Sequence, residues 1–190
     1  GLGDVYKRQD DEVVALRAAY KLGQQAGSGR RPALQALVHA LNSNEQPHSN
    51  LHVYGGDGSN WHEDVAVRSA AHGLVQAGAV ALPGLSRAAE DASARGRKHA
   101  VFALGEIGHS RSQKALIKSL QDRDVHVAIA AAEALGLTPP TAVAVTALVK
   151  ALQHPEAEVR FDAALSLLRY AAQGQTKLLS CTVPALADAL

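Results

Sequence analysis

One short phrase returns five times along the chain, and this repetition limits the possible folds more than any other feature. Each copy is a run of alanines and other small residues around an anchor leucine. The anchors are Leu22, Leu74, Leu104, Leu135 and Leu167. Their last three spacings give a period of about 31 residues, and the first gap carries about 20 extra residues. Small residues let neighbouring helices approach closely while the leucines fill a shared core, so each copy predicts a helix, named helix A here.

A second phrase follows each copy and predicts a partner helix, named helix B. It carries an apolar pair four residues apart, usually two leucines, which forms one stripe on a helix. The five copies span residues 36–41, 84–89, 115–120, 147–152 and 185–190. Pro83 and Pro184 fall near the first turn of a helix B, where the missing amide is not needed. Five helix pairs thus account for nearly all of residues 10–190.

The helical phrases resemble a known repeat family. Val159-Arg160-Phe161-Asp162-Ala163-Ala164 and Ala103-Leu104-Gly105-Glu106-Ile107-Gly108 are similar to HEAT repeats of the short, phycobilisome-lyase-like kind. The resemblance covers nearly the whole chain. It implies an all-α, right-handed α-solenoid of about five antiparallel helix pairs, in which helices B line the concave side and each repeat contacts only its neighbours. Adaptors, bilin lyases, hydroxylases and DNA-repair proteins share this repeat, so it implies no single function.

Three segments depart from the repeat. Residues 4–9 resemble the translation of a transposon end used in sequencing libraries, and the sequence contains no Met. We therefore expect residues 1–9 to be a non-native, adapter-derived leader; the alternative is a native disordered leader. The HEAT-like repeat domain is then 10–190, with an inserted loop at 42–61. Residues 185–190 stop inside an apolar helical pattern without a Gly or Asn cap, which predicts truncation within the last helix.

No set of titratable residues forms a recognisable catalytic or metal site. The di-iron hydroxylases that resemble this repeat class place His-Glu pairs on several helices A, but the aligned pairs here supply no repeat with both ligands. Those pairs are Arg17-Ala18, Ser69-Ala70, His99-Ala100, Ala130-Ala131 and Asp162-Ala163. A metal site from His48, His52, Asp57 and His62 would lie on a loop and matches no rigid ligand template. We therefore expect no catalytic residue, metal or cofactor.

The inserted loop holds the only Trp, Trp61, together with Tyr54. Long loops in compact repeats are often functional, and aromatic residues contribute much of the binding energy at interfaces. Trp61 and Tyr54 are therefore candidate partner-binding residues. The alternative is a tolerated surface insertion in which Trp61 staples the loop to the next helix, and the sequence leaves both interpretations open.

Alignment of the helices B produces a column of mostly basic residues: His39, Arg87, Lys118, Lys150 and Asp188. Neighbouring cations about 10 Å apart repel by only about 0.4 kcal/mol in water, so a solvated face tolerates them without any ligand. The other interpretation is a surface for an anionic partner, with contacts that are individually weak and sensitive to salt.

Charge and composition narrow the class of partner. Lys plus Arg (19) and Asp plus Glu (18) nearly cancel, which disfavours nucleic acid and anionic membranes as partners. We predict a non-catalytic protein-protein interaction scaffold that binds another protein with an acidic surface through the helix-B face and the 42–61 loop. The alternative is an accessory region of a bilin-lyase-type enzyme. The single Cys is compatible with a cytoplasmic location.

Overall fold

The computed structural model describes residues 2–42 and 65–174, which form nine α-helices and two short 3-10 helices and contain no strand. The contacts divide the chain into two compact units, unit 1 (Gly1–Ala81) and unit 2 (Leu82–Leu190), and each is described by itself. Trp61, Tyr54, Asp188 and the predicted helix at 185–190 lie outside the described residues. None of the described helices combines the length and apolarity needed to cross a membrane.

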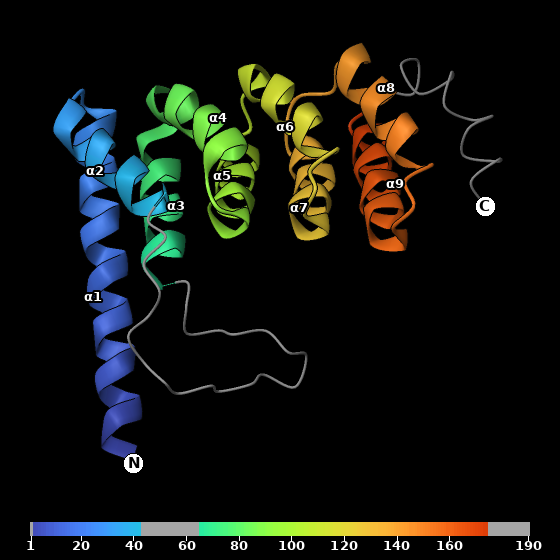
Figure 1. The fold of residues 1–190 in the computed structure, drawn as a ribbon. Coiled ribbons are helices and arrows are strands. Elements are labelled where there is room, and N and C mark those ends of the chain that lie inside the picture. Colours follow the sequence, from blue (N-terminus) through green and yellow to red (C-terminus); the bar gives the residue numbers. More distant parts are fainter. Residues whose placement is uncertain (1, 43–64, 175–190) are drawn as a thin grey trace. The chain divides into compact units, whose positions relative to one another are not determined.

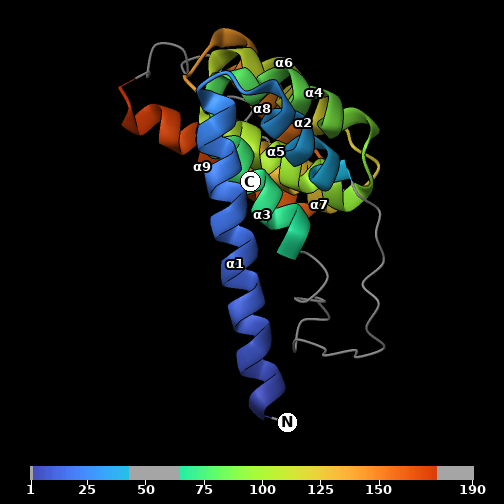
Figure 2. The ribbon, with the colours of Figure 1, turned by 90° about the vertical axis from the view of Figure 1, so that its left-hand side faces the viewer.

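Unit 1 contains α1 (Leu2–Gly27), α2 (Arg31–Asn42), α3 (Val65–Ala77) and the 3-10 helix η1 (Gly78–Ala81). Helix α1 packs along α3, its first turns run past the end of α3 (Figure 2), and α2 packs on both helices. Close approach depends on small residues, because a Cβ on Gly73 would lie 2.5 Å from the Ala19 carbonyl oxygen. Residues 2–9 continue α1 without a break, so the expected leader has no boundary in the secondary structure.

Unit 2 is built from two layers of helices (Figure 1). One layer holds the helices A, which are α5 (Ala94–Ile107), α7 (Val125–Leu135) and α9 (Ala157–Ala172). The other holds the helices B, which are α4 (Leu82–Asp91), α6 (Gln113–Ser119) and α8 (Ala142–Ala151), with the 3-10 helix η2 (Ser110–Ser112) before α6. Each helix A packs on the next, and each helix B packs on the neighbouring helices A of the unit. The predicted all-α solenoid is confirmed.

The anchor leucines form the core, as predicted. Leu74, Leu104 and Leu135 have no exposed surface, Leu167 is 3% exposed, and only Leu22 is half-buried. The burial of these apolar side chains away from water is the main stabilising contribution to such a stack of helices.

A glycine directly after the anchor leucine sets the distance between successive helices A. A Cβ on Gly105 of α5 would lie 2.6 Å from the Ala134 Cβ of α7, and a Cβ on Gly136, directly after α7, would overlap the Ser166 hydroxyl of α9. The last described helix A of each unit lacks this glycine and carries Val75 or Leu168 instead. The close helix contacts inside each unit therefore depend on glycines, Gly105 and Gly136 in unit 2 and Gly23 and Gly73 in unit 1.

Polar side chains complete the ends of the helices in unit 2. Ser93, Asp124 and Thr141 each accept a hydrogen bond from a backbone N–H in the first turn of α5, α7 and α8, respectively. Such caps satisfy amides that have no partner within the helix. The Pro139-Pro140 turn ends at the Thr141 cap of α8.

A buried hydrogen-bond network joins α9 to the end of α7. The Tyr170 hydroxyl donates to the Leu135 carbonyl oxygen, and the Thr138 hydroxyl donates to the same oxygen at 2.8 Å. Gln113 donates to Thr138 at 3.0 Å and accepts from Thr141 at 2.8 Å. Burial raises the pKa of Tyr170, against the effect of its contact with Thr138. The network satisfies polar groups that would be costly to bury alone.

Candidate functional site

Three of the predicted partner-binding residues lie on the helices B of unit 2, one on each helix. Arg87 of α4, Lys118 of α6 and Lys150 of α8 are all exposed, and α4 contacts α6 as α6 contacts α8. We call these three residues the basic face. His39 is exposed on α2 of unit 1.

The charges of the basic face are not equally available. The Lys118 Nζ atom lies 2.7 Å from Glu90 Oε2, and the two side chains are 66% and 45% exposed. This pair neutralises the central cation in part. Within the described ranges, Arg87 and Lys150 have no ion-pair partner, so these two carry the unpaired positive charge of the face.

An apolar groove lies beside Lys150, between α6 and α8. It has a volume of about 430 Å³ and is lined by Ile117, Ala142, Val143, Thr146, Ala147 and Lys150. Val143 is 67% exposed and, with Ile117 and two alanines, makes the lining of the groove mostly apolar. The groove and the lysine together suit a partner segment that carries both aliphatic and acidic side chains.

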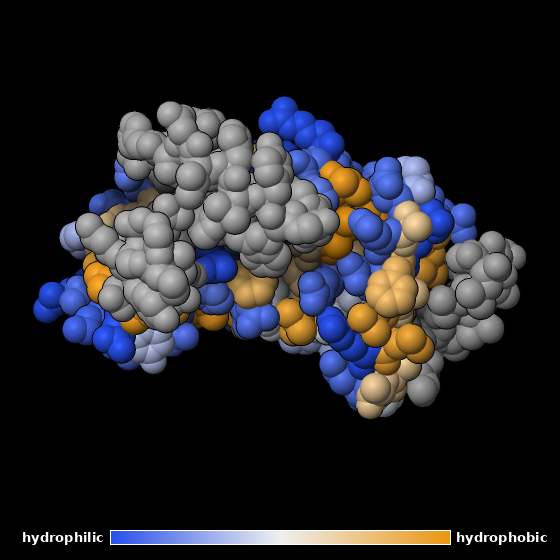
Figure 3. Space-filling model, turned by 90° about the horizontal axis from the view of Figure 1, so that it is seen from below, coloured by the Kyte–Doolittle hydropathy of each residue, from blue (hydrophilic) through white to orange (hydrophobic). Residues whose placement is uncertain are grey.

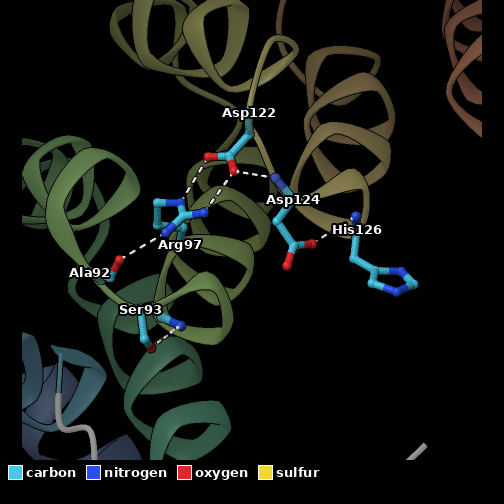
Figure 4. A network of polar contacts seen from close by, with 7 residues as sticks. Ala92, Ser93, Arg97, Asp122, Asp124 and His126 are labelled. Atoms are coloured by element: carbon cyan, nitrogen blue, oxygen red, sulfur yellow. Dashed lines mark hydrogen bonds and ion pairs between the residues drawn. The ribbon is translucent and has the colours of Figure 1, made fainter. Parts of the chain in front are cut away.

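One charge pair of the unit is buried. Arg97 is 2% exposed. Its Nε and Nη2 atoms donate to the two carboxylate oxygens of Asp122 at 2.8 and 2.7 Å, and Nη1 donates to the Ala92 carbonyl oxygen at 3.0 Å (Figure 4). Asp122 also accepts from the Asp124 backbone N–H at 2.9 Å. The Arg97 side chain therefore ties α5 to the turn before it and to the turn between α6 and α7.

The ionisation of this pair follows from its contacts. Burial alone would raise the pKa of Asp122, but the hydrogen bonds from Arg97 and Asp124 outweigh it and hold that pKa below its usual value. The hydrogen bond to Asp122 in turn raises the pKa of Arg97. Both groups stay charged at neutral pH and compensate each other, so the pair is structural and offers no reactive group.

Sequence reasoning missed this arginine, although the repeat carries a signal for it. Arg97 stands seven residues before the anchor Leu104, and Arg160 stands seven residues before Leu167. Arg160 Nη1 likewise donates to carbonyl oxygens of the turn before its helix, those of His154 at 2.9 Å and of the next residue at 2.7 Å. An arginine at this position thus binds the preceding turn in both repeats.

No metal-binding group was found where side chains are described: no three His, Cys, Asp or Glu residues there lie close enough to hold an ion. The loop residues His48, His52, Asp57 and His62 lie outside that part of the chain, so the interpretation of that loop stays untested.

Residues 82–169 match the family model described as HEAT repeats. These residues are HEAT repeats. They run from α4 into α9 and contain the whole basic face. HEAT repeats generally mediate protein-protein interactions as scaffolds, whereas the match does not identify the phycobilisome-lyase-like subtype, which stays a prediction. A search of curated proteins found no match.

Proposed function

We propose that the HEAT repeats of unit 2 bind a protein segment that carries aliphatic and acidic side chains. The segment lies across the basic face, with an aliphatic side chain in the α6–α8 groove and carboxylates on Arg87 and Lys150. The single observation that carries the proposal is the exposed Val143 beside the unpaired Lys150, at one groove. Apolar contact supplies affinity there, while the cations supply orientation and speed of association.

Lys118 is expected to contribute less to partner binding than Arg87 and Lys150, although it lies on the middle helix of the three. A partner carboxylate that binds Lys118 has to displace Glu90, which already lies 2.7 Å away. Binding then exchanges one exposed ion pair for another, and exposed ion pairs contribute little to the free energy of binding. Arg87 and Lys150 are therefore expected to dominate the charge dependence.

The test uses a labelled peptide with leucines four residues apart, flanked by glutamates, and a scrambled peptide of the same composition. Binding to the full chain is followed by fluorescence anisotropy at several salt concentrations. Lys150→Glu and Val143→Glu should each weaken binding by about tenfold, and added salt should weaken binding of the unaltered protein. Lys98→Glu, an exposed charge reversal on α5, is the matched control and should leave binding unchanged. Equal binding of both peptides, or an equal effect of Lys98→Glu, contradicts the proposal.

The inserted loop extends the proposal to unit 1. Trp61 and Tyr54 are the proposed aromatic contacts, and His39 is a further contact on α2. Because Trp61 is the only Trp of the chain, its fluorescence reports on this loop alone. A shift of that emission when the leucine-glutamate peptide binds supports a contact at the loop, and an unchanged emission at saturation excludes it. The accessory role in a bilin-lyase-type enzyme stays an alternative, for which a co-purifying chromophore is the test.

A further inference from the structure

Helix α9 carries an apolar stripe on the side opposite its core contacts. Val159, Ala163, Ser166 and Tyr170 are buried toward the core. The opposite stripe recurs every three or four residues and consists of Ala157, Phe161, Leu165, Leu168 and Ala172. Phe161 is 68% exposed and Leu168 is 65% exposed. A surface helix normally presents polar residues on its outer side. Among the described residues, this stripe, named the α9 stripe, is an apolar surface without a covering helix.

The apolar surface continues from α9 onto α7. A hollow of about 430 Å³ between the two helices is lined by Ile129, Ala157, Glu158, Phe161 and Asp162. Apolar groups gather at this end of unit 2 when it is seen from the side of the helices A, at the right of Figure 3. The hollow offers a place for one side chain of whatever covers the stripe.

A further helix A packed as in the rest of the unit does not fit the α9 stripe. Inside the unit, the next helix A rests on a glycine, Gly105 or Gly136, where even a single Cβ would be too close. In α9 the residue at that position is Leu168. A helix at the same distance would overlap the leucine side chain, so the stripe requires a cover that packs at a greater distance.

The charges along one flank of the stripe are arranged in a self-complementary way. Glu158 and Asp162 lie one turn apart on this flank, and Arg169 lies about two turns further on, since an α-helix has 3.6 residues per turn. The first half of the flank is acidic and the second half is basic. When two such helices pair in antiparallel orientation about a two-fold axis, the same flanks meet and the acidic half of one faces the basic half of the other.

We propose that the α9 stripe docks a second copy of this chain, with the two α9 helices antiparallel. Phe161 of each copy then packs against Leu168 of the other, and Arg169 of each copy lies near Glu158 and Asp162 of the other. This surface is separate from the basic face, so the two proposals stand or fall independently.

The surroundings of Asp162 agree with this pairing. Burial raises the pKa of Asp162, and the nearby Glu133 and Glu158 raise it further, while Arg169 of the same helix acts in the opposite direction. Arg169 of the same helix therefore offsets the effects of burial and of the two glutamates only in part. A second Arg169 approaching from the other copy supplies further positive charge.

A contact through one helix is smaller than the roughly 800 Å² per partner of a standard stable interface, so the dimer is expected to be weak. The full chain is therefore measured by sedimentation velocity between about 10 and about 500 μM. The mass should rise from 19.8 kDa toward twice that value. Phe161→Glu should raise the dissociation constant by at least about tenfold. Val143→Glu on α8 replaces a side chain of the same exposure, 67%, and should leave the dimer unchanged.

Charge exchange gives a second, more specific test. Arg169→Glu should weaken the dimer, and adding Glu158→Arg should restore it, with circular dichroism showing that each variant is folded. A mass that stays at the monomer value throughout, or a dimer that is indifferent to Phe161→Glu, overturns the proposal. It is also overturned if a chain ending at Gly174 dimerises while the full chain does not, because residues 175–190 then cover the stripe.

Discussion

Two ion pairs of unit 2 have the same closest distance and very different surroundings, which makes them a test of how burial changes the value of a charge pair. Arg97–Asp122 and Lys118–Glu90 both have a shortest N···O distance of 2.7 Å. The side chains of the first pair are 3% and 10% exposed, and those of the second are 66% and 45% exposed. Replacing Arg97 or Lys118 with Met removes the cation in either case and keeps most of the side-chain volume.

The expected losses differ several-fold. Arg97→Met leaves the Asp122 carboxylate buried with only the Asp124 N–H as a described donor, and removing one partner of a buried pair costs about 3–5 kcal/mol. Lys118→Met leaves Glu90 in water, and loss of an exposed pair costs about 1 kcal/mol or less. With a urea dependence of about 2 kcal/mol/M, the unfolding midpoint should fall by about 1.5–2.5 M for Arg97→Met and by about 0.5 M or less for Lys118→Met.

The loss at Arg97 should also depend on pH. The pKa of Asp122 is lowered in the folded protein, so its contribution is present above the ordinary Asp pKa of about 4 and disappears as the pH falls through the lower folded value. The difference between the unaltered protein and Arg97→Met should therefore shrink in acid below about pH 4. The measurement is urea unfolding followed by circular dichroism at several pH values.

Two outcomes would refute this reasoning. Equal midpoint shifts for the two Met variants would mean that burial does not decide the value of the pair. A loss at Arg97 that persists unchanged in strong acid would mean that side-chain packing, and not the charge of Asp122, causes it. Arg97→Met combined with Asp122→Leu is the control, because it removes the uncompensated carboxylate and should recover a large part of the lost stability.

Three further changes test the packing of unit 2. Gly136→Ala should cost about 1–3 kcal/mol, measured by thermal unfolding, because the new Cβ would overlap the Ser166 hydroxyl. Tyr170→Phe should cost about 1–2 kcal/mol in urea unfolding, since it removes a buried hydrogen bond to the Leu135 carbonyl oxygen. Asp162→Asn should stabilise the protein at pH 7, because burial and neighbouring acids raise the pKa of Asp162 and so disfavour its ionised form; the gain should vanish below about pH 4, where the unfolded chain is also protonated.

Each of these predictions has an outcome that would contradict it. Gly27→Ala is the control for Gly136→Ala, since its new Cβ would lie 3.6 Å from the nearest atom, and an equal loss there would remove the steric explanation. An unchanged midpoint for Tyr170→Phe would show that the hydroxyl contributes nothing. A gain from Asp162→Asn that persists at pH 3 would show that ionisation is not its cause.

The helix pairs could be predicted because each depends on residues close in sequence. The anchor leucines and the small residues around them specify both the helix and its buried side, and the core follows that pattern. The ion-pair partners of Arg97 and Lys118 could not be predicted from neighbouring residues in this way. Asp122 lies 25 residues after Arg97, and Glu90 lies 28 residues before Lys118. Both sequence separations are close to the period of one repeat. Only an alignment of the repeats that is accurate to a single residue would have paired each cation with its acid.

The exposed part of α9 illustrates a different limit. Phe161 and Leu168 are visible in the sequence as apolar residues of a helix A, and an equivalent pattern elsewhere would be read as core. Phe161 and Leu168 are exposed because α9 is the last helix described in its unit. The position of a helix in the stack cannot be inferred from the sequence of that helix alone. The substitution of Leu168 for the usual glycine was the one local indication that this surface differs from the others.

The hydroxyl of Tyr170 has a consequence for how the array opens. It satisfies a carbonyl at the end of α7 from the following repeat, so that carbonyl loses a partner when α9 detaches. Local opening of a stack normally begins at its ends. Here the last turn of α7 and the last turn of α9, which carries Tyr170, should exchange their amide hydrogens at similar rates, because this hydrogen bond joins the two turns.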